Sequence, residues 1–264
     1  MNSFDFVFFV EAIPPLIIEG VPVALLLTFL ATVVGFAIGL LFAVVNIVQI
    51  RDYHTYHSRM EKFLHDTRRF ILLVIKRIVL VFTGAVRGTP PVLLLFIVYF
   101  GLPQVTKGFG LILDTTKITV KFALVILAVG TAVASNSCEM FRSAYNALDK
   151  GQIEAGKSLG YTTWQRFIHI ILPQGLRVIL PNIGNMIIQE VHNSSLIYYL
   201  GVVDIMGKAK QINANVFNAK SLELYVAAAL IYWILCFIIG KLVRLSEKSM
   251  DKGTGKIGKG VTVG

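Results

Sequence analysis

EMFRSAYNALDKGQIEAGKSLGYTTWQRFIHIILP, residues Glu139–Pro173, is a polar, cation-rich stretch between long apolar runs. Within it, Gly151–Ser158 (GQIEAGKS) matches the phosphate-loop pattern G-x-x-x-x-G-K-[ST] at every position. The same stretch can also be a polar loop that joins two membrane-spanning helices. The two interpretations predict different proteins, and the rest of the chain distinguishes between them.

The composition indicates an integral membrane protein. The chain has 264 residues, of which 55% are hydrophobic and 15% are charged, and its mean hydropathy is +0.72. Soluble domains have roughly 45–50% apolar and about 25% charged residues, so this chain has too little polar surface for one. The formal net charge of +10 marks cytoplasmic loops and contact with anionic lipid headgroups. Aromatic residues lie in the apolar runs rather than among the basic clusters, which argues against nucleic acid as a partner.

Cysteine and histidine positions indicate neither a disulfide framework nor a metal site. Cys138 and Cys236 are far apart, each in or beside an apolar run, and we expect them to be small core residues. His54 and His57 have the i,i+3 spacing of half a metal site, but no second ligand pair accompanies them. We therefore interpret both histidines as solvated helix surface and predict no metal site.

Apolar runs predict an all-α fold with five transmembrane helices, since about 20 helical residues cross the ~30 Å hydrocarbon core. The runs cover residues 21–48, 78–100, 122–137, 175–200 and 222–243, and the connections 101–120 and 201–220 are predicted to be polar loops. Arg87–Pro91 (RGTPP) interrupts the second run, and either a broken spanning helix or a loop at the membrane surface fits it. Gly35 and Gly39 form G-x-x-x-G, which either allows close helix approach or reflects the ordinary glycine content of membrane helices.

Loop charges predict the orientation of these helices. The basic stretches are residues 51–77, residues 139–173 and the tail from Lys241 onward, whereas the N-terminus and the two other connections carry little charge. Because basic loops stay in the cytoplasm, the N-terminus is expected outside and the C-terminus inside.

The domain organisation follows from the same pattern. Residues 1–20 are predicted to be an extracytoplasmic or interfacial segment, 21–245 the transmembrane domain, and 246–264 a flexible tail. Within the domain, residues 51–77 have apolar side chains at helical spacing, and we predict a basic amphipathic helix at the cytoplasmic membrane face.

The fourth predicted span is unusually polar for a membrane helix. A charged side chain deep in a bilayer costs about 2.5–3.5 kcal/mol on insertion scales, so such residues are candidates for a cavity or a partner contact. Hydrogen bonding between helices is the structural alternative. The polar side chains of this span are Asn182, Asn185, Gln189, Glu190, His192, Asn193, Ser194 and Ser195.

The phosphate-loop interpretation of Gly151–Ser158 does not fit its surroundings. A phosphate loop follows a buried strand and opens a helix, whereas FRSAYNALDK before Gly151 is polar and lacks a β-branched run. All neighbouring elements are predicted membrane helices, which leave no room for a nucleotide-binding sheet. We therefore predict that this chain has no nucleotide site and is not an enzyme.

A second spacing in the opening stretch is more specific. Glu154-Ala155-Gly156, three residues, Gly160, nine residues, Ile170, one residue and Leu172-Pro173 resembles the EAA loop of bacterial ABC importer permeases. That loop has Ala at the third position, where this chain has Gly156. Further motifs over residues 20–245 resemble the polar amino acid permeases; they are RGTP at 87–90, YFGLP at 99–103, EMFRSA at 139–144 and ILPQGLRVILPNIGN at 171–185.

The resemblance implies a non-catalytic permease of the ABC type I importer fold in the bacterial inner membrane. Two such subunits, either two copies or this chain and a paralogue, would pair and bind two cytoplasmic ATPase subunits, which hold ATP and Mg²⁺. An extracytoplasmic solute-binding protein would deliver the substrate. The residues implied for ATPase coupling are Glu154, Ala155, Gly156, Gly160, Leu172 and Pro173. We expect Gly160 to adopt a positive φ and Pro173 to start the fourth span rigidly.

The resemblance also implies a substrate pathway between the third and fourth spans. Its predicted residues are Asn136, Met186, Gln189, Glu190, Asn193 and Ser194, with Ala132 beside them. The acidic pattern that suits a cationic amino acid is reduced here to Glu190, so we expect a zwitterionic or neutral polar substrate such as glutamine or cystine. There are two alternatives. The chain could be an ABC permease for another small solute, or an ion-coupled carrier or channel that relays protons through Glu190 and His192.

Overall fold

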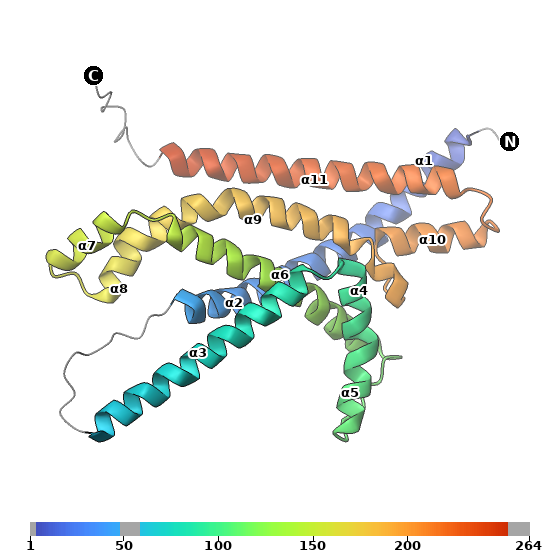
Figure 1. Cartoon of the computed structure of the whole chain (residues 1–264). Helices are drawn as coiled ribbons and strands as arrows, with labels where there is room; N and C mark the ends of the chain where they lie inside the picture. Colours follow the sequence, from blue (N-terminus) through green and yellow to red (C-terminus); the bar gives the residue numbers. More distant parts are fainter. Residues whose placement is uncertain (1–3, 48–58, 253–264) are drawn as a thin grey trace.

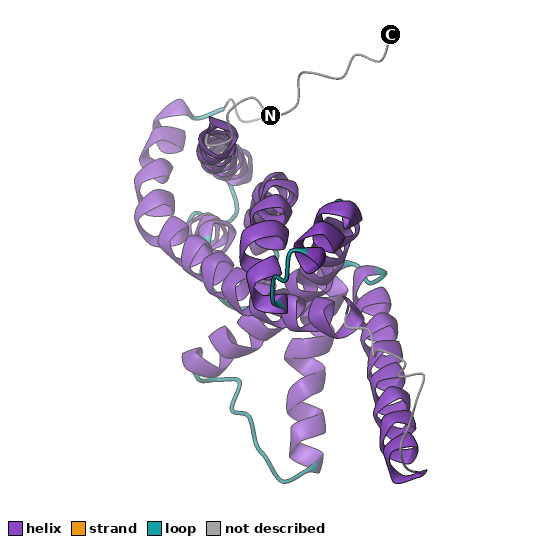
Figure 2. Cartoon of the chain, turned by 90° about the vertical axis from the view of Figure 1, so that its left-hand side faces the viewer, coloured by secondary structure: helices purple, strands orange, loops and turns teal. Residues whose placement is uncertain are grey.

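The structure is a computed structural model that describes residues 4–47 and 59–252, and every regular element in these residues is a helix (Figures 1 and 2). Figure 1 labels α1 Phe6–Pro15, α2 Val21–Ile47, α3 Arg59–Arg87, α4 Pro91–Phe96, α5 Leu102–Gly108, α6 Ile118–Asn146, α7 Lys150–Ser158, α8 Thr163–Arg166, α9 Leu172–Ser194, α10 Ile205–Asn215 and α11 Ser221–Lys252. Three π-helical turns join consecutive helices without a break: η1 Leu16–Gly20, η2 Ile97–Gly101 and η3 Phe167–Ile171. A 3₁₀ turn, η4 Ile197–Leu200, follows α9.

The predicted number of five membrane spans is confirmed within the described residues. Helices long and apolar enough to cross a bilayer cover Phe6–Ile47, Pro91–Gly108, Ile118–Asn146, Trp164–Ser194 and Ser221–Lys248. The first span is longer than predicted, because residues 6–20 continue into α2 instead of forming a separate interfacial segment. Pro14 and Pro15 do not end the helix, since a π turn follows them directly and takes up the disturbance of the hydrogen-bond ladder.

The bounds predicted for the second span, 78–100, are wrong. Residues 78–87 belong to the long helix α3, and the chain breaks at Gly88–Pro90 before a new helix begins at Pro91. Proline disfavours helical backbone in the residue before it and suits the first helical turn, so Pro90-Pro91 ends one helix and starts the next. The span therefore runs from Pro91 to Gly108 and includes part of the predicted loop 101–120.

Two other predicted irregular segments are partly helical. The connection 201–220 contains α10, whose first turn is capped by Asp204: its carboxylate accepts a hydrogen bond from the Gly207 backbone nitrogen at 2.8 Å. Ile205, Ala209 and Asn213 form its buried face. Residues 246–252 of the predicted tail continue α11, while 253–264 lie outside the described residues. The predicted amphipathic segment 51–77 is described from Arg59 onward, as the first part of α3.

The core of the bundle is the close contact between α2 and α6. Gly35 and Gly39 of α2 face α6, where an added Cβ atom would lie 2.7 Å from the carbonyl oxygens of Gly130 and Ala134, respectively. Of the two interpretations of this G-x-x-x-G, the structure supports close helix approach. Around this contact, α1 packs against α10 and α11, and α9 lies beside α11 (Figure 1).

We predict that Gly39→Ala destabilises the chain, whereas Gly84→Ala does not. The new methyl group at position 39 would collide with backbone and force the two helices apart, which typically costs about 1–3 kcal/mol. Gly84 in α3 has no atom within 4 Å of an added Cβ, so alanine there gains only its better helix propensity. Thermal unfolding of the purified chain in detergent compares the two variants, and equal melting temperatures would contradict the packing argument.

Candidate functional site

The α7–α8 hairpin, residues 149–171, contains the sequence that matched a phosphate loop. Asp149 caps α7 by accepting a hydrogen bond from the Gly151 nitrogen at 2.8 Å. Gly151–Ser158 lies entirely inside α7, so its backbone N–H groups belong to a helix and form no phosphate cradle. The structure thus agrees with the rejection of the nucleotide site.

Gly160 ends α7 in a left-handed conformation, with φ of 82°. The Gly160 nitrogen donates to the carbonyl of Lys157 at 3.1 Å, and the Tyr161 nitrogen donates to the carbonyl of Gly156 at 3.0 Å. These two bonds form the Schellman motif, which favours glycine at the position of Gly160. The expected positive φ at Gly160 is therefore confirmed.

A capping box starts the second helix of the hairpin. The Thr162 nitrogen donates to Oε1 of Gln165 at 2.8 Å, and the Gln165 nitrogen donates to Oγ1 of Thr162 at 3.2 Å. This reciprocal pair satisfies two backbone N–H groups at the helix start. The Schellman glycine and the capping box are only two residues apart, so the turn between the helices is tightly specified.

Gly156 explains the spacing between the two halves of the hairpin. It is buried, and an added Cβ would lie 2.6 Å from Cδ1 of Ile170 in η3. The side chain of Gln174 also bridges back to Gln152, with a hydrogen bond of 2.7 Å. The small residue at position 156 and the apolar residue at 170 are thus contact partners across the hairpin. The small size of Gly156 therefore serves its contact with Ile170 inside the hairpin rather than a contact with another protein.

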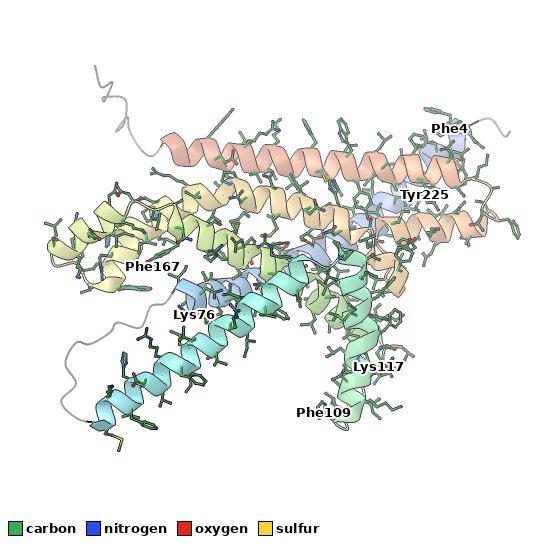
Figure 3. All side chains as sticks on the ribbon, in the orientation of Figure 1. Phe4, Lys76, Phe109, Lys117, Phe167 and Tyr225 are labelled. Atoms are coloured by element: carbon green, nitrogen blue, oxygen red, sulfur yellow. The ribbon has the colours of Figure 1, made fainter. Side chains whose placement is uncertain are left out.

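The outer face of the hairpin is exposed and partly apolar. Leu159 is 76% exposed and Trp164 is 68% exposed, and Phe167 stacks on Trp164 with ring centroids 5.7 Å apart (Figure 3 labels Phe167). Glu154 is exposed too, and its carboxylate pairs with no other described residue; Ala155 is also exposed. Exposed apolar groups rimmed by polar ones are typical of a surface that contacts another protein or a membrane.

Pro173 does not start the fourth span, contrary to our prediction. The helix is continuous from Thr163 through η3 to Ser194, and Leu172 and Pro173 follow the π turn inside it. Proline cannot donate the helical hydrogen bond, and the preceding π turn is the distortion that accommodates it. The same arrangement occurs at Pro103, directly after η2.

A second candidate site is a small, mainly apolar cavity of about 20 Å³ between α4, α6 and the end of α9, which we call the polar hollow after its two polar residues, Glu190 and Asn193. Glu190 is its ionisable group and is only 3% exposed. Oε2 of Glu190 accepts a hydrogen bond from Nδ2 of Asn193, and Oδ1 of Asn193 accepts one from Nε2 of Gln189, both at 3.3 Å. The lining residues are Pro91, Leu94, Leu95, Ala128, Val129, Ala132, Glu190, Asn193, Leu196 and Ile197.

The residues predicted for the pathway separate into three groups. Glu190, Asn193 and Ala132 line the polar hollow, and Gln189 joins them through its hydrogen bond to Asn193. Ser194 is buried, and its hydroxyl donates to the Val191 carbonyl at 2.8 Å. Asn136 is exposed and Met186 is half-buried, and neither lines the hollow.

Sequence reasoning considered a broken spanning helix at RGTPP but assigned no residue of α4 to the pathway. Pro91, Leu94 and Leu95 form one wall, and the break at RGTPP is what starts a new helix there. This break was the available signal, because interrupted spanning helices often line transport pathways. A cavity of this size holds about one water molecule, so no amino acid fits in it as it stands.

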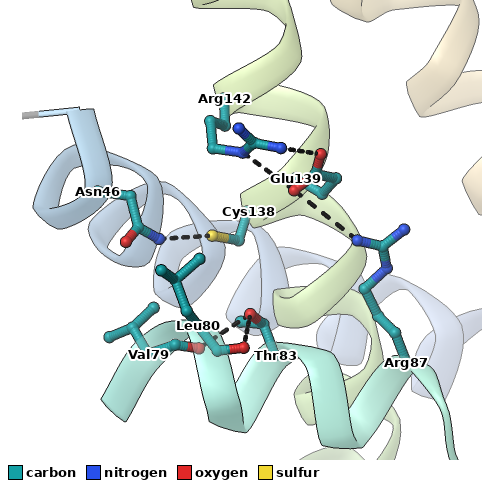
Figure 4. Close-up of polar contacts among 8 residues, drawn as sticks. All are labelled: Asn46, Val79, Leu80, Thr83, Arg87, Cys138, Glu139 and Arg142. Atoms are coloured by element: carbon teal, nitrogen blue, oxygen red, sulfur yellow. Dashed lines mark hydrogen bonds and ion pairs between the residues drawn. The ribbon is translucent and has the colours of Figure 1, made fainter. Parts of the chain in front are cut away.

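An ion cluster ties α3 to α6 at the start of this break (Figure 4). Glu139 accepts a hydrogen bond from Nε of Arg142 at 3.1 Å and pairs with Arg87 at 3.8 Å. Next to it, Nδ2 of Asn46 in α2 donates to the sulfur of buried Cys138 at 3.7 Å. The cluster therefore joins three helices at one level of the bundle.

Cys138 is the small core residue that we expected, whereas Cys236 is half-buried, with its sulfur 3.2 Å from Nε2 of His192. Among the described residues, no group of three or more His, Cys, Asp or Glu side chains could hold a metal ion. His54 and His57 lie outside the described residues.

Comparison with known proteins agrees with this geometry. Residues 69–252, more than half of the chain, match the family model described as a binding-protein-dependent transport system inner membrane component. The chain is similar to the probable amino-acid permease protein YxeN of Bacillus subtilis (strain 168), with 31% identity over 96% of this chain and 98% of the relative. It is also similar to the L-cystine transport system permease protein TcyL of the same organism, with 30% identity over 92% of this chain and 90% of the relative.

Among solved structures, the crystal structure of an amino acid ABC transporter with histidines has a similar fold. The TM-score is 0.74 at 27% identity, and the match covers 94% of this chain and 100% of that chain.

We predict that Gly156→Ala loosens the α7–α8 hairpin and that Ile170→Val restores it. The added methyl group would meet Cδ1 of Ile170, and valine lacks that atom. Limited proteolysis of the hairpin measures the effect: a destabilisation of about 1 kcal/mol raises the cleavage rate roughly five-fold. The double variant should be cleaved more slowly than Gly156→Ala alone, with Ile170→Val as the control; strictly additive effects would contradict the contact.

Proposed function

We infer the substrate and the partner contacts of this chain from the family to which it belongs, the binding-protein-dependent transport system inner membrane components. The chain is the inner membrane permease subunit of an ABC importer for amino acids, and ATP hydrolysis resides in a separate subunit. Its partners therefore include an ATPase and a solute-binding protein. One observation carries the finer proposal. A single continuous helix, from α8 through η3 to α9, connects the α7–α8 hairpin to the polar hollow.

We propose that the α7–α8 hairpin binds the ATPase. Its exposed face combines Leu159, Trp164 and Phe167 with the carboxylate of Glu154, which pairs with no side chain in the described part of the chain. Glu154, Ala155 and Gly160 remain accessible in the structure, whereas Gly156 holds the hairpin together from inside. Two permease subunits and two ATPase subunits complete the transporter, each hairpin contacting one ATPase.

This assignment sets the orientation. The hairpin and the C-terminal end of α11 lie at one end of the bundle, and the N-terminus lies at the opposite end (Figure 1). With the hairpin on the ATPase, the C-terminus is cytoplasmic and the N-terminus is outside. The excess of positive charge in residues 59–77 and 139–173 supports the same orientation.

We propose that the polar hollow is the part of the substrate pathway that this subunit supplies, and that the substrate is a polar amino acid. Glu190 can pair with the α-ammonium group, and the amide groups of Asn193 and Gln189 can bind a carboxylate. One carboxylate beside two amides suits a zwitterion, such as cystine or glutamine, better than a cationic amino acid. Because the hollow itself holds about one water, the second permease subunit must contribute the rest of the site.

Uptake by proteoliposomes tests this function. The permease is reconstituted with its ATPase, and candidate solute-binding proteins are added with labelled cystine, glutamine and arginine. We expect ATP-dependent uptake of cystine or glutamine, and a fall of about ten-fold or more in the Glu190→Gln variant because the ammonium group loses its partner. Uptake that an ion gradient drives without ATP, or uptake of arginine alone, would overturn the proposal.

A bulky residue at position 160 should uncouple transport. At the φ of 82° observed for Gly160, leucine costs about 1–2 kcal/mol and displaces the turn, whereas asparagine tolerates this conformation. We expect Gly160→Leu to lower uptake at least about ten-fold, by the loss of about 1.4 kcal/mol or more of coupling, while Gly160→Asn transports nearly as well as wild type. Membrane insertion is the control, and normal uptake by Gly160→Leu would refute the coupling role.

A further inference from the structure

The turn between α10 and α11, residues 216–220, has an unusual backbone. Phe217 has φ of 52° and Asn218 has φ of 60°, and in residues 4–47 and 59–252 they alone combine a positive φ with a side chain. Asparagine tolerates this region, but a bulky aromatic residue does so rarely.

The hydrogen bonds of this turn define the position of Phe217. The Phe217 nitrogen donates to the Ala214 carbonyl at 3.1 Å, and the Asn218 nitrogen donates to the Asn213 carbonyl at 2.8 Å. These are the two bonds of a Schellman motif, in which Phe217 occupies the position that glycine favours. The equivalent position at the end of α7 is Gly160, where the same motif has the glycine that it favours.

Among the residues that the structure describes, Phe217 finds no packing that would offset this strain. Its side chain is 94% exposed, the largest exposed fraction among the large apolar side chains described. Asn215 and Ala219 are exposed beside it, and the ion pair of Lys220 with Asp5 lies at the end of the same turn. A strained and fully exposed aromatic residue contributes nothing to folding, and such strain persists mainly at functional sites.

The turn is nevertheless held in place by hydrogen bonds and an ion pair. Nδ2 of Asn213 donates to Oγ of Ser221 at 2.8 Å, and that hydroxyl donates to the Asn218 carbonyl at 3.2 Å. Lys220 binds Asp5 at the start of the first span, with Nζ and Oδ2 2.8 Å apart. This hydrogen bond is the main reason why the pKa of the Asp5 carboxyl lies below its usual value, so this carboxyl is ionised at neutral pH. A rigid anchor loses little entropy when a partner binds it.

We propose that Phe217 is the aromatic anchor on which the extracytoplasmic solute-binding protein docks. The inference rests on the proposed function, because the turn lies near the N-terminus, at the end of the bundle away from the α7–α8 hairpin (Figure 1). Interface hot spots are aromatic side chains with a polar rim, which is the chemistry of this turn. Lipid insertion fits less well, since Lys220, the cation of the turn, is bound to Asp5 and therefore does not seek a headgroup.

Two glycine substitutions test the anchor. Phe217→Gly removes the ring and relaxes the Schellman position, whereas Asn218→Gly relaxes the neighbouring position and keeps the ring. Each reconstituted complex is titrated with the substrate-loaded solute-binding protein that supports wild-type uptake, and stimulation of ATP hydrolysis is the readout. We expect the concentration for half-maximal stimulation to rise about ten-fold or more in Phe217→Gly and to stay within about two-fold in Asn218→Gly.

Thermal unfolding separates this effect from misfolding. Because glycine suits the turn, the melting temperature of Phe217→Gly should equal or exceed that of wild type while its response to the binding protein is weakened. If a well-folded Phe217→Gly complex needs the same binding-protein concentration for half-maximal stimulation as wild type, the docking proposal is wrong. The importer function would be unaffected by that result. If no binding protein stimulates the wild-type complex, the importer function fails, and this surface fails with it.

Phe217→Trp separates a protein partner from the bilayer. The parent chain already has Trp164 and Trp233, so its emission spectrum is subtracted from that of the variant. The remaining emission, from the new tryptophan, should shift when the binding protein is added to the transporter in nanodiscs. Quenching of this emission by brominated lipid, without any shift on addition of the binding protein, would overturn the proposal in favour of lipid insertion.

Discussion

The close approach of α2 and α6 is the contact on which the rest of the bundle depends. Helices in lipid gain no hydrophobic energy from each other, so they associate where small residues let their backbones come together. Gly35 and Gly39 provide that surface against Gly130 and Ala134. α6 in turn carries Ala128, Val129 and Ala132 of the polar hollow, and it ends three residues before the α7–α8 hairpin begins. Both candidate sites are therefore built outward from this one helix pair.

Helix interruptions place the functional groups around that pair. The break at Gly88–Pro90 lets α4 start beside α6 and close one wall of the polar hollow. At the same level, Glu139 of α6 forms an ion pair with Arg87 at the end of α3, next to the break (Figure 4). Without this break, a straight spanning helix would not place Pro91, Leu94 and Leu95 against the polar hollow. The proline pair is thus a structural cause of the site. A membrane tolerates such a break only where protein covers the backbone groups that lose their helical hydrogen bonds.

The sequence predicted the helix class, the number of spans and the polar character of α9, because apolar length and loop charge report these directly. It did not predict where helices continue. Pro14, Pro103 and Pro173 all lie in uninterrupted helices, since a π turn next to each absorbs the missing hydrogen bond, and no residue pattern announces a π turn. The Asn-rich composition of 201–220 concealed α10, although the Asp204 cap and the buried positions 205, 209 and 213 were present in the sequence.

For the candidate site, sequence spacing identified Glu190 and Asn193 but not their surroundings. Ala132 was predicted from the resemblance, whereas the α4 wall depends on how a helix turns after a break, which spacing along the chain does not contain. Asn136 and Met186 share helices with the hollow but face elsewhere. Likewise, the Gly156 and Ile170 positions were recognised as a motif, and only the structure shows that they touch.

The continuity of α8, η3 and α9 changes how the hairpin can act on the polar hollow. A helix that began at Pro173 would allow the hairpin to pivot there without moving α9. In the observed helix, Pro173 and Glu190 are joined by about 26 Å of unbroken helix at 1.5 Å per residue, so a displacement of the hairpin moves the hollow as well. The π turn η3 and Pro181 are the compliant points of this lever, because each lacks part of the regular hydrogen-bond ladder. Under the proposed function, the ATPase and the substrate pathway are then coupled through this one continuous helix, which has no interruption at Pro173.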